Sequence, residues 1–352
     1  MKSGRVVYQN GIYVDEKDAK VSIFDSALMF GDMVFEMTRS FNGEQFKLKE
    51  HIDRLYVGLK ILQIPIKHSK EDLENICYET MKKNQPFFEE HDEHRLLINV
   101  SRGPLGIYSP IFDNKLEPTV IVADFPLKWT VAGMDELIDE GVNAVVVSQR
   151  AIPSSLMEPK IKNRSRLFYQ MANIEASRIK GKNNWAVLLG TDGFITEGTG
   201  DNLFFVKNGV VYTPEPRDIL VGISRNYVME LCEEMGIKCI EKNIEVYDAY
   251  TSDECFMTAT PFCLLPVFTF NGLKIGTGKM GEITQRIHDK WSENVGLDIF
   301  QQIRDYSAEC KILNKDQPTP YQFNPNDDET CLLYTSDAAD DLLCVDLGGR
   351  RI

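Results

Sequence analysis

The sequence lacks long apolar runs and is poor in basic residues, and both features exclude whole classes of function. No apolar stretch approaches the roughly 20 residues that span a bilayer, and the first residues lead directly into polar, strand-like sequence rather than a signal peptide. Its 39 Lys and Arg stand against 53 Asp and Glu, which gives a formal charge of -14. Nucleic acids and anionic membranes bind basic surfaces, so we expect a cytoplasmic protein that binds neither.

Several motif classes are also missing. The eight cysteines form no CxxC pair, so we expect reduced, structural thiols. His91 and His94 have a spacing that suits a metal but lack further ligands, and we predict no metal site. Walker, zinc-finger, HExxH and GxSxG patterns are absent. Residues 276–281 match GxGxxG, yet they follow a hairpin and open no βαβ unit, which excludes a dinucleotide fingerprint.

The remaining composition is that of an ordinary globular protein. With 43% hydrophobic and 26% charged residues over 352 positions, the chain is long enough for two domains with separate cores. Residues 124–134 break the periodicity and contain Pro126 and Gly133, so we expect the linker there. It would join a small domain over 1–123 to a larger one over 135–305.

The pattern decays after residue 305. Residues 306–330 are rich in Pro, Asn and Asp, and we expect them to be disordered. Residues 331–352 resemble the translation of a sequencing-library adapter, so we leave them out of the fold prediction.

Local signals predict both strands and helices in the two domains. Asn-Gly supplies the two positive-φ positions of a type I′ turn, and four such pairs predict hairpins at residues 10–11, 42–43, 208–209 and 271–272. Apolar residues at helical spacing predict a helix over residues 49–62. Ser69 and Asp72 form a capping box that opens a second helix. We therefore expect an α/β (α+β) fold.

A run of alternating basic residues is unusual in this acidic chain. Lys160, Lys162, Arg164 and Arg166 occupy every second position. In an extended segment this period of two places all four on one side, where they repel each other unless an anion lies opposite. A solvated basic edge strand is the alternative interpretation. A helix is predicted from Leu167, so Lys162 lies on the approach to it.

The N-terminal domain offers two further candidate cations. Phe35, Met37 and Arg39 share one face of a predicted strand. Arg39 either extends to water or binds a carboxylate. Arg54 lies beside the apolar stripe of its helix, from which it can reach a phosphate.

The second domain offers a carboxylate and two anion-binding turns. Glu197 precedes a pair of glycines that allow close approach of the backbone, although a solvated surface hairpin has the same pattern. Residues 222–224 open a helix, whose free N–H groups and Ser hydroxyl suit an anion. Thr258 and Thr260 place hydroxyls at the end of a strand, where ligands of α/β proteins usually bind.

Together these groups match the requirements of one cofactor. Pyridoxal 5′-phosphate (PLP) needs a lysine amine for its Schiff base, a carboxylate for its protonated ring nitrogen, and amide, hydroxyl and Arg donors for its phosphate. The sequence supplies this set with Lys162, Glu197, Arg54, residues 222–224 and Thr260. We therefore predict a PLP enzyme.

Over roughly residues 6–303 the sequence resembles the fold-type IV aminotransferases, the group of branched-chain and D-amino-acid aminotransferases. The motifs that carry the resemblance are His51-Ile-Asp-Arg-Leu55, Ile161-Lys162-Asn163, Thr196-Glu197-Gly198, Gly222-Ile223-Ser224-Arg225 and Ala259-Thr260. The resemblance implies that Lys162 carries PLP and that Glu197 binds its ring nitrogen. It assigns the phosphate to Arg54, Ile223, Ser224, Ala259 and Thr260. It also implies a small N-terminal and a larger C-terminal α/β domain, the cofactor between them, and a homodimer whose partner loop helps to close each site.

The family includes enzymes for several amino donors, and particular residues favour one of them. Phe35 and the loop that begins at Arg102 resemble the branched-chain enzymes, whereas Ile107 and Ser109 stand where D-amino-acid enzymes place Arg and His. We therefore predict transfer from an L-branched-chain amino acid to a 2-oxo acid such as 2-oxoglutarate. The predicted substrate contacts are Phe35, Met37, Arg39, Arg102 and Leu105. The alternatives are a D-amino-acid or (R)-amine transaminase, an aminodeoxychorismate lyase, and a non-catalytic protein with the same fold.

Three departures from the family pattern predict a bulkier pocket. Met37 stands in place of a usual Gly, and Pro261-Phe262 stands in place of small residues beside the phosphate turn. Leu167 stands where some members place a Tyr near O3′ of the cofactor.

Overall fold

The computed structural model describes residues 4–313, and the side chains of residues 4–310. The described chain forms two compact units. Unit 1 contains the residues up to Trp129 together with Lys160–Arg166, and unit 2 contains Thr130–Pro159 and the residues from Leu167 onward. The boundary after Trp129 lies inside the predicted linker, but the segment around Lys162 groups with unit 1 and not with its neighbours in sequence. The adapter-like residues 331–352 lie outside the described residues.

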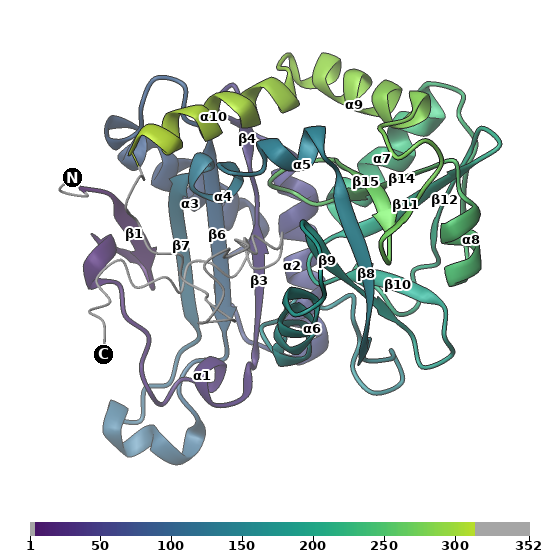
Figure 1. Cartoon of the computed structure of the whole chain (residues 1–352). Coiled ribbons are helices and arrows are strands. Elements are labelled where there is room, and N and C mark those ends of the chain that lie inside the picture. Colours follow the sequence, from purple (N-terminus) through teal and green to yellow (C-terminus); the bar gives the residue numbers. More distant parts are fainter. Residues whose placement is uncertain (1–3, 314–352) are drawn as a thin grey trace. The chain divides into compact units, whose positions relative to one another are not determined.

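Unit 1 combines a five-stranded sheet, the separate two-stranded sheet β4-β5 and two long helices (Figure 1). In chain order its elements are β1 (Val6–Gln9), β2 (Ile12–Asp15), the 3₁₀ helix η1 (Glu16–Asp18), α1 (Ser26–Phe30), β3 (Met33–Met37), β4 (Ser40–Phe41), β5 (Glu44–Gln45), α2 (Leu48–Leu62), α3 (Lys70–Asn84), η2 (Gln85–Phe87), β6 (His94–Ser101), η3 (Gly106–Phe112) and β7 (Thr119–Pro126). Helix α4 (Lys128–Val131) spans the boundary between the units. The five-stranded sheet is antiparallel, with the strand order β2-β1-β7-β6-β3.

The main core of unit 1 lies between this sheet and the helices α2 and α3. The helix predicted over 49–62 is confirmed as α2, and the predicted capping box of Ser69 and Asp72 opens α3. Because α2 is amphipathic, it buries one apolar stripe against the sheet. The buried residues of this core include Tyr8, Val34, Leu48, Ile52, Leu55, Leu59, Leu73, Cys77, Met81, Leu96, Ile98, Val100, Val120 and Val122.

The opposite face of β3, β6 and β7 carries a second apolar cluster. Side chains alternate along a strand, so Val34 points to the helices while its neighbours point the other way. Every residue of β3 is buried, which shows that both faces of this strand are covered. The buried members of the second cluster are Met33, Phe35, Met37, Leu97 and Phe125.

Unit 2 contains a larger, mixed sheet (Figure 1). Its elements are α5 (Asp135–Asp139), β8 (Val142–Arg150), α6 (Leu167–Ser177), β9 (Asn184–Leu189), β10 (Ile195–Gly198), β11 (Asn202–Lys207), β12 (Val210–Pro214), α7 (Ile223–Glu234), β13 (Cys239–Lys242), α8 (Val246–Thr251), β14 (Glu254–Thr258), β15 (Leu265–Phe270), β16 (Leu273–Lys274), α9 (Glu282–Val295) and α10 (Ile299–Leu313). The strand order is β10-β9-β8-β15-β14-β11-β12-β13, with β16 beside β15. The pairs β8-β9, β8-β15 and β12-β13 are parallel.

All four predicted Asn-Gly hairpins are present. They join β1 to β2, β4 to β5, β11 to β12 and β15 to β16. The φ of Asn10 is 47° and that of Gly11 is 93°, and both residues of the other three pairs also have positive φ. The turn chemistry therefore fixes these connections locally.

Two segments differ from their predictions. Helix α10 continues to Leu313, past the end of the second domain that the sequence pattern places at residue 305. The alternating basic stretch is not an extended strand, because residues 159–166 form turns and bends outside the described strands. Charge alternation alone therefore did not determine the backbone conformation of this stretch.

A buried ion pair connects α2 to β3. Glu36 lies on the helix-facing side of β3, and its side chain is fully buried. Arg54 donates to both of its oxygens, from Nε at 2.6 Å and from an Nη at 2.7 Å, and Nδ1 of His51 lies 2.7 Å from Oε2. A carboxylate removed from water needs such partners, because burial of an unpaired charge costs several kcal/mol.

The ionisation of this cluster follows from burial and from charge. Burial raises the pKa of Glu36, but the charges and hydrogen bonds of Arg54 and His51 outweigh it and lower the pKa to about 2. Burial also lowers the pKa of His51, and the attraction of Glu36 only partly opposes this. Glu36 is therefore ionised and His51 neutral at pH 7, and the Glu36–Arg54 pair carries the charge.

We predict that Glu36→Gln lowers the free energy of unfolding at pH 7 by about 3 kcal/mol, because it leaves the Arg54 guanidinium without its counter-charge. The folded pKa lies below the ordinary 4.5, so this contribution is present above that pH and disappears as the pH falls toward 2. Urea denaturation of both proteins between pH 7 and pH 3 measures the difference. Glu117→Gln, which removes an exposed ion pair with Lys67, is the control and should cost below about 1 kcal/mol. Equal losses in the two variants would contradict a buried pair.

Candidate active site

The residues around Lys162 bring three of the four alternating cations to one aromatic ring. The amide of Phe35 donates to the carbonyl oxygen of Lys162 at 3.0 Å. Nζ of Lys162 lies 4.7 Å from the centre of the Phe35 ring, Cζ of Arg164 lies 3.7 Å from it and Cζ of Arg166 lies 5.7 Å from it. Cations over a ring face are attracted by about 0.5–2 kcal/mol each. Phe35 therefore holds this irregular segment against β3.

The cluster around Phe35 gives Lys162 an apolar neighbourhood. Met37 lies on the same face of the strand, and both side chains are buried. Arg39 is also buried, with its guanidinium 3.8 Å from the centre of the Phe41 ring and with Nε donating to the carbonyl of Ser40. The prediction that Arg39 extends to water is therefore wrong.

Arg95 is another buried arginine of unit 1, and it was not predicted from the sequence. Arg95 lies on β6 and is fully buried, with one Nη 3.8 Å from Sδ of Met37. A charged residue in a strand that is otherwise mostly apolar could have predicted this buried arginine from the sequence.

Arg54, the predicted phosphate ligand of unit 1, is held in a fixed orientation by Glu36. The paired guanidinium is mostly buried, with 14% of its side chain exposed. A bidentate pair restricts a long side chain to one conformation. Neither Glu36 nor His51 was predicted as part of the site, although a carboxylate inside a buried strand is a detectable anomaly.

In unit 2 the Glu197 carboxylate is buried and accepts several hydrogen bonds. Oη of Tyr169 donates to Oε1 at 2.7 Å. The amide of Leu220 and Nδ2 of Asn202 donate to Oε2 at 2.9 and 3.2 Å. Only 5% of Glu197 is exposed, so the interpretation as a solvated surface hairpin is wrong. Tyr169 and Asn202 were not predicted, because these contacts depend on the tertiary fold.

Asn202 brings the predicted groups of unit 2 together. In addition to its bond with Glu197, its Nδ2 donates to the carbonyl of Leu220 at 3.0 Å. A Cβ built on Gly222 would lie 2.3 Å from its Oδ1, so a larger residue at that position would displace this amide. In the ladder between β11 and β14, Asn202 is opposite Thr258. Glu197, the start of α7 and the end of β14 therefore lie around one amide side chain.

The start of α7 and the turn after β14 carry the predicted phosphate donors. Gly222 precedes α7 and provides no side-chain cap for its first amides, those of Ile223 and Ser224. Oγ1 of Thr258 is buried and has no hydrogen-bond partner in the described part of the chain. Ala259 and Thr260 follow it directly. Uncapped amides and an unmatched hydroxyl suit an anion.

PLP fits these groups. A buried carboxylate held by neutral donors can face a protonated ring nitrogen, and the glycine cradle with the unmatched hydroxyl can take a phosphate. These features all belong to unit 2, whereas Lys162 and Arg54 belong to unit 1.

Arg102, Leu105 and Leu167 were also singled out in the sequence, but their described contacts involve none of the site residues above. The guanidinium of Arg102 pairs with Asp32 at 2.6 Å and donates to the carbonyls of Leu62 and Gln63 at the end of α2. The described contacts of Arg102 are therefore structural, and its contact with the substrate stays a prediction. Leu105, which is also a predicted substrate contact, is half-buried and lies at the start of η3. The side chain of Leu167 is 75% exposed.

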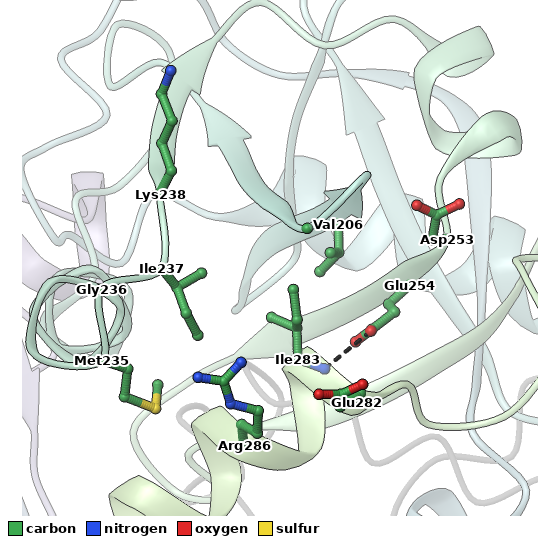
Figure 2. Close-up of a pocket in the computed structure, with 11 residues that line it drawn as sticks. Val206, Met235, Gly236, Ile237, Lys238, Asp253, Glu254, Glu282, Ile283 and Arg286 are labelled. Carbon is green, nitrogen blue, oxygen red and sulfur yellow. Dashed lines mark hydrogen bonds between the residues drawn. The ribbon is translucent and has the colours of Figure 1, made fainter.

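A separate hollow of about 590 Å³ lies in unit 2 between α9, the α7–β13 turn and the β11–β12 hairpin (Figure 2). Figure 2 shows Glu254 bound to the amide of Ile283, so this carboxylate already covers the start of α9. Charges of both signs line the hollow, from Lys238 and Arg286 to Asp253. None of the predicted site residues lines it.

Residues 4–313 were predicted to contain neither a metal site nor a membrane-spanning segment. No group of three or more His, Cys, Asp or Glu side chains in this range is placed to hold a metal ion. None of its helices combines the length and the apolar character needed to cross a bilayer.

Comparison with known proteins is consistent across sequence and structure. The model of the amino-transferase class IV family matches residues 33–269. The chain is 39% identical over 289 residues to the "Putative branched-chain-amino-acid aminotransferase" of Methanocaldococcus jannaschii, a match that covers 82% of this chain and 95% of that protein.

Two solved structures resemble the chain along most of its length. The branched-chain amino acid aminotransferase of Escherichia coli superposes with a TM-score of 0.74 at 28% identity, over 84% of this chain and 94% of that one. The T.th. branched-chain amino acid aminotransferase complexed with N-(5′-phosphopyridoxyl)-L-glutamate has a TM-score of 0.72 at 27% identity, over 87% and 97%. The predicted α/β fold of the fold-type IV group is thereby confirmed. The chain belongs to the class IV aminotransferases.

Proposed function

We propose that this aminotransferase uses PLP to move the amino group of an L-branched-chain amino acid to a 2-oxo acid such as 2-oxoglutarate. The observation that carries the choice of donor is the apolar cluster beside Lys162, in which the Phe35 ring lies 4.7 Å from Nζ and packs with Met33, Met37, Leu97 and Phe125. A branched aliphatic side chain suits apolar surroundings, because burial of its own surface contributes about 25 cal/mol per Å². The names of the relatives support the same donor.

The chain supplies a residue for each part of the cofactor. PLP acts as an electron sink that stabilises negative charge at Cα of the substrate. Lys162 would hold the cofactor through its aldehyde carbon, and its Nζ, once released, would carry the proton from Cα of the substrate to C4′. Glu197 would balance the protonated ring nitrogen. The amides of Ile223 and Thr260, the hydroxyl of Ser224 and the guanidinium of Arg54 would hold the phosphate, with Ala259 shaping the turn.

Substrate recognition divides between apolar and charged groups of unit 1. Phe35, Met37 and Leu105 contact the aliphatic side chain. Arg39, a buried cation two residues after the end of β3, binds the substrate carboxylate.

We predict that reduction with borohydride fixes the cofactor to a peptide that contains Lys162, because only a bound imine is reduced to a stable amine. Lys162→Ala should lose the visible absorbance of the bound cofactor and at least about 10³-fold in transamination rate, as expected for loss of the proton-transfer group. Lys160→Ala is the matched control and should keep both. Mass spectrometry of the digested protein identifies the peptide. A protein that stays colourless with added PLP would support the non-catalytic alternative instead.

We predict that L-leucine reacts at least about tenfold faster than D-alanine or (R)-phenylethylamine, with 2-oxoglutarate as the acceptor, because it combines an aliphatic side chain with a carboxylate. The measurement is the initial rate of glutamate formation with each donor. A faster rate with D-alanine or with the amine would indicate a D-amino-acid or (R)-amine transaminase instead. Lyase activity without any transamination would indicate an aminodeoxychorismate lyase.

We also propose that the protein is a homodimer, because unit 1 exposes an apolar lobe formed by residues 23–30 and 105–112. The two segments are joined by the bond from the Leu105 amide to the carbonyl of Phe24 at 3.3 Å and by the Phe24 and Tyr108 rings, whose centres lie 4.6 Å apart. Large exposed apolar patches mark interaction surfaces. The exposed members are Ile23, Leu28, Met29, Phe30, Ile107 and Ile111.

We predict that the double variant Leu28→Glu with Ile107→Glu dissociates the dimer, because it buries two charges in the interface. Sedimentation equilibrium should give twice the chain mass for the native protein and one chain mass for the variant. Leu273→Glu, at an exposed apolar residue of unit 2, should remain dimeric. A dimer that survives the double substitution would exclude this lobe as the interface.

A reducing compartment fits the thiols of the described chain. The cysteines 77, 232, 239, 255, 263 and 310 are all free, and most of them are buried. Proteins of oxidising compartments commonly pair their cysteines. We therefore place the enzyme in the cytoplasm.

A further inference from the structure

Tyr169 contacts the carboxylate that we assign to the cofactor. Its Oη lies 2.7 Å from Oε1 of Glu197, and the two residues are 28 positions apart in the sequence. The other oxygen, Oε2, accepts from the Leu220 amide and from Asn202. We assign the ring nitrogen to Oε1, the oxygen that Tyr169 orients.

Both partners of this bond stand on well-packed elements. The small residues Ala172 and Ala176 let α6 approach β8 and β9, and the helix is buried there together with Val145 and Leu188. Strand β10, which carries Glu197, pairs with β9. The phenol is therefore placed by the packing of its helix, and its hydroxyl selects one orientation of the carboxylate.

The chemistry of the described donors suits a carboxylate that must meet a cation. A phenol, a side-chain amide and a backbone amide are neutral, so they stabilise the negative charge without cancelling it. An arginine in the place of Tyr169 would neutralise the carboxylate, as Arg54 does for Glu36.

We propose that Tyr169 is a positioning residue that orients Glu197 toward the ring nitrogen of the cofactor. This inference rests on the proposed role of Glu197. Tyr169 acts through the carboxylate, so its loss should be felt only by a ligand that carries the ring nitrogen.

The test compares two ligands that bind without a covalent bond to Lys162. They are pyridoxamine 5′-phosphate and its analogue with C–H in place of the ring nitrogen, titrated calorimetrically into cofactor-free protein. Tyr169→Phe should weaken binding of pyridoxamine 5′-phosphate by about tenfold, because the ligand must then orient a carboxylate that the phenol no longer holds in place. Binding of the analogue should change by less than about twofold, because the analogue gives Glu197 no partner.

Two further variants separate the possible outcomes. Glu197→Gln should also weaken only pyridoxamine 5′-phosphate, and adding Tyr169→Phe to it should cause no further loss. If Glu197→Gln affects both ligands equally, the proposed role of Glu197 fails. If Glu197→Gln discriminates but Tyr169→Phe does not, the proposed function stands and the inference about Tyr169 is overturned.

A matched control guards against a structural effect. Tyr250→Phe removes another hydroxyl of unit 2, one that accepts from Asn271 at 2.8 Å, and should change neither affinity. Tyr169→Phe keeps the ring that packs 4.1 Å from Phe168. Equal weakening of both ligands by Tyr169→Phe would indicate general damage to the fold and would overturn the proposal.

Discussion

The buried carboxylate of Glu36 places a strong constraint on the packing of unit 1. A charge in the middle of a strand, on the face that packs against a helix, must be matched from that helix. His51 and Arg54 do so from adjacent turns of α2, at 2.6 to 2.7 Å. The pairing fixes how α2 lies on the sheet, and it also fixes the guanidinium that we assign to the phosphate. An interaction that stabilises the fold therefore prepares a ligand group.

The buried carboxylate of Glu197 accepts from donors of a different kind than Glu36 does. Its described hydrogen bonds come from Tyr169, Asn202 and the Leu220 amide, which are neutral donors. Such donors stabilise the ionised form of the group without bringing a counter-charge of their own. Burial alone therefore does not separate the two carboxylates, whereas the chemistry of their described donors does.

How far the sequence predicted these features depends on the range of the interactions. The Asn-Gly hairpins and the Ser69 capping box are local, and they were predicted correctly. The bond between Tyr169 and Glu197 joins residues 28 positions apart, and that between Glu36 and Arg54 joins residues 18 apart. No local pattern encodes such contacts. The grouping of Lys160–Arg166 with unit 1 is likewise a tertiary property.

The alternating cations show how a wrong conformation can still lead to a useful inference. The stretch is irregular, yet Lys162, Arg164 and Arg166 all reach the Phe35 ring. In a chain of net charge -14, this gathering of cations is a local exception that the sequence pattern did identify. The alternation therefore marked which side chains act together, while the hydrogen bond from the Phe35 amide to the carbonyl of Lys162 is a tertiary contact that no local pattern encodes.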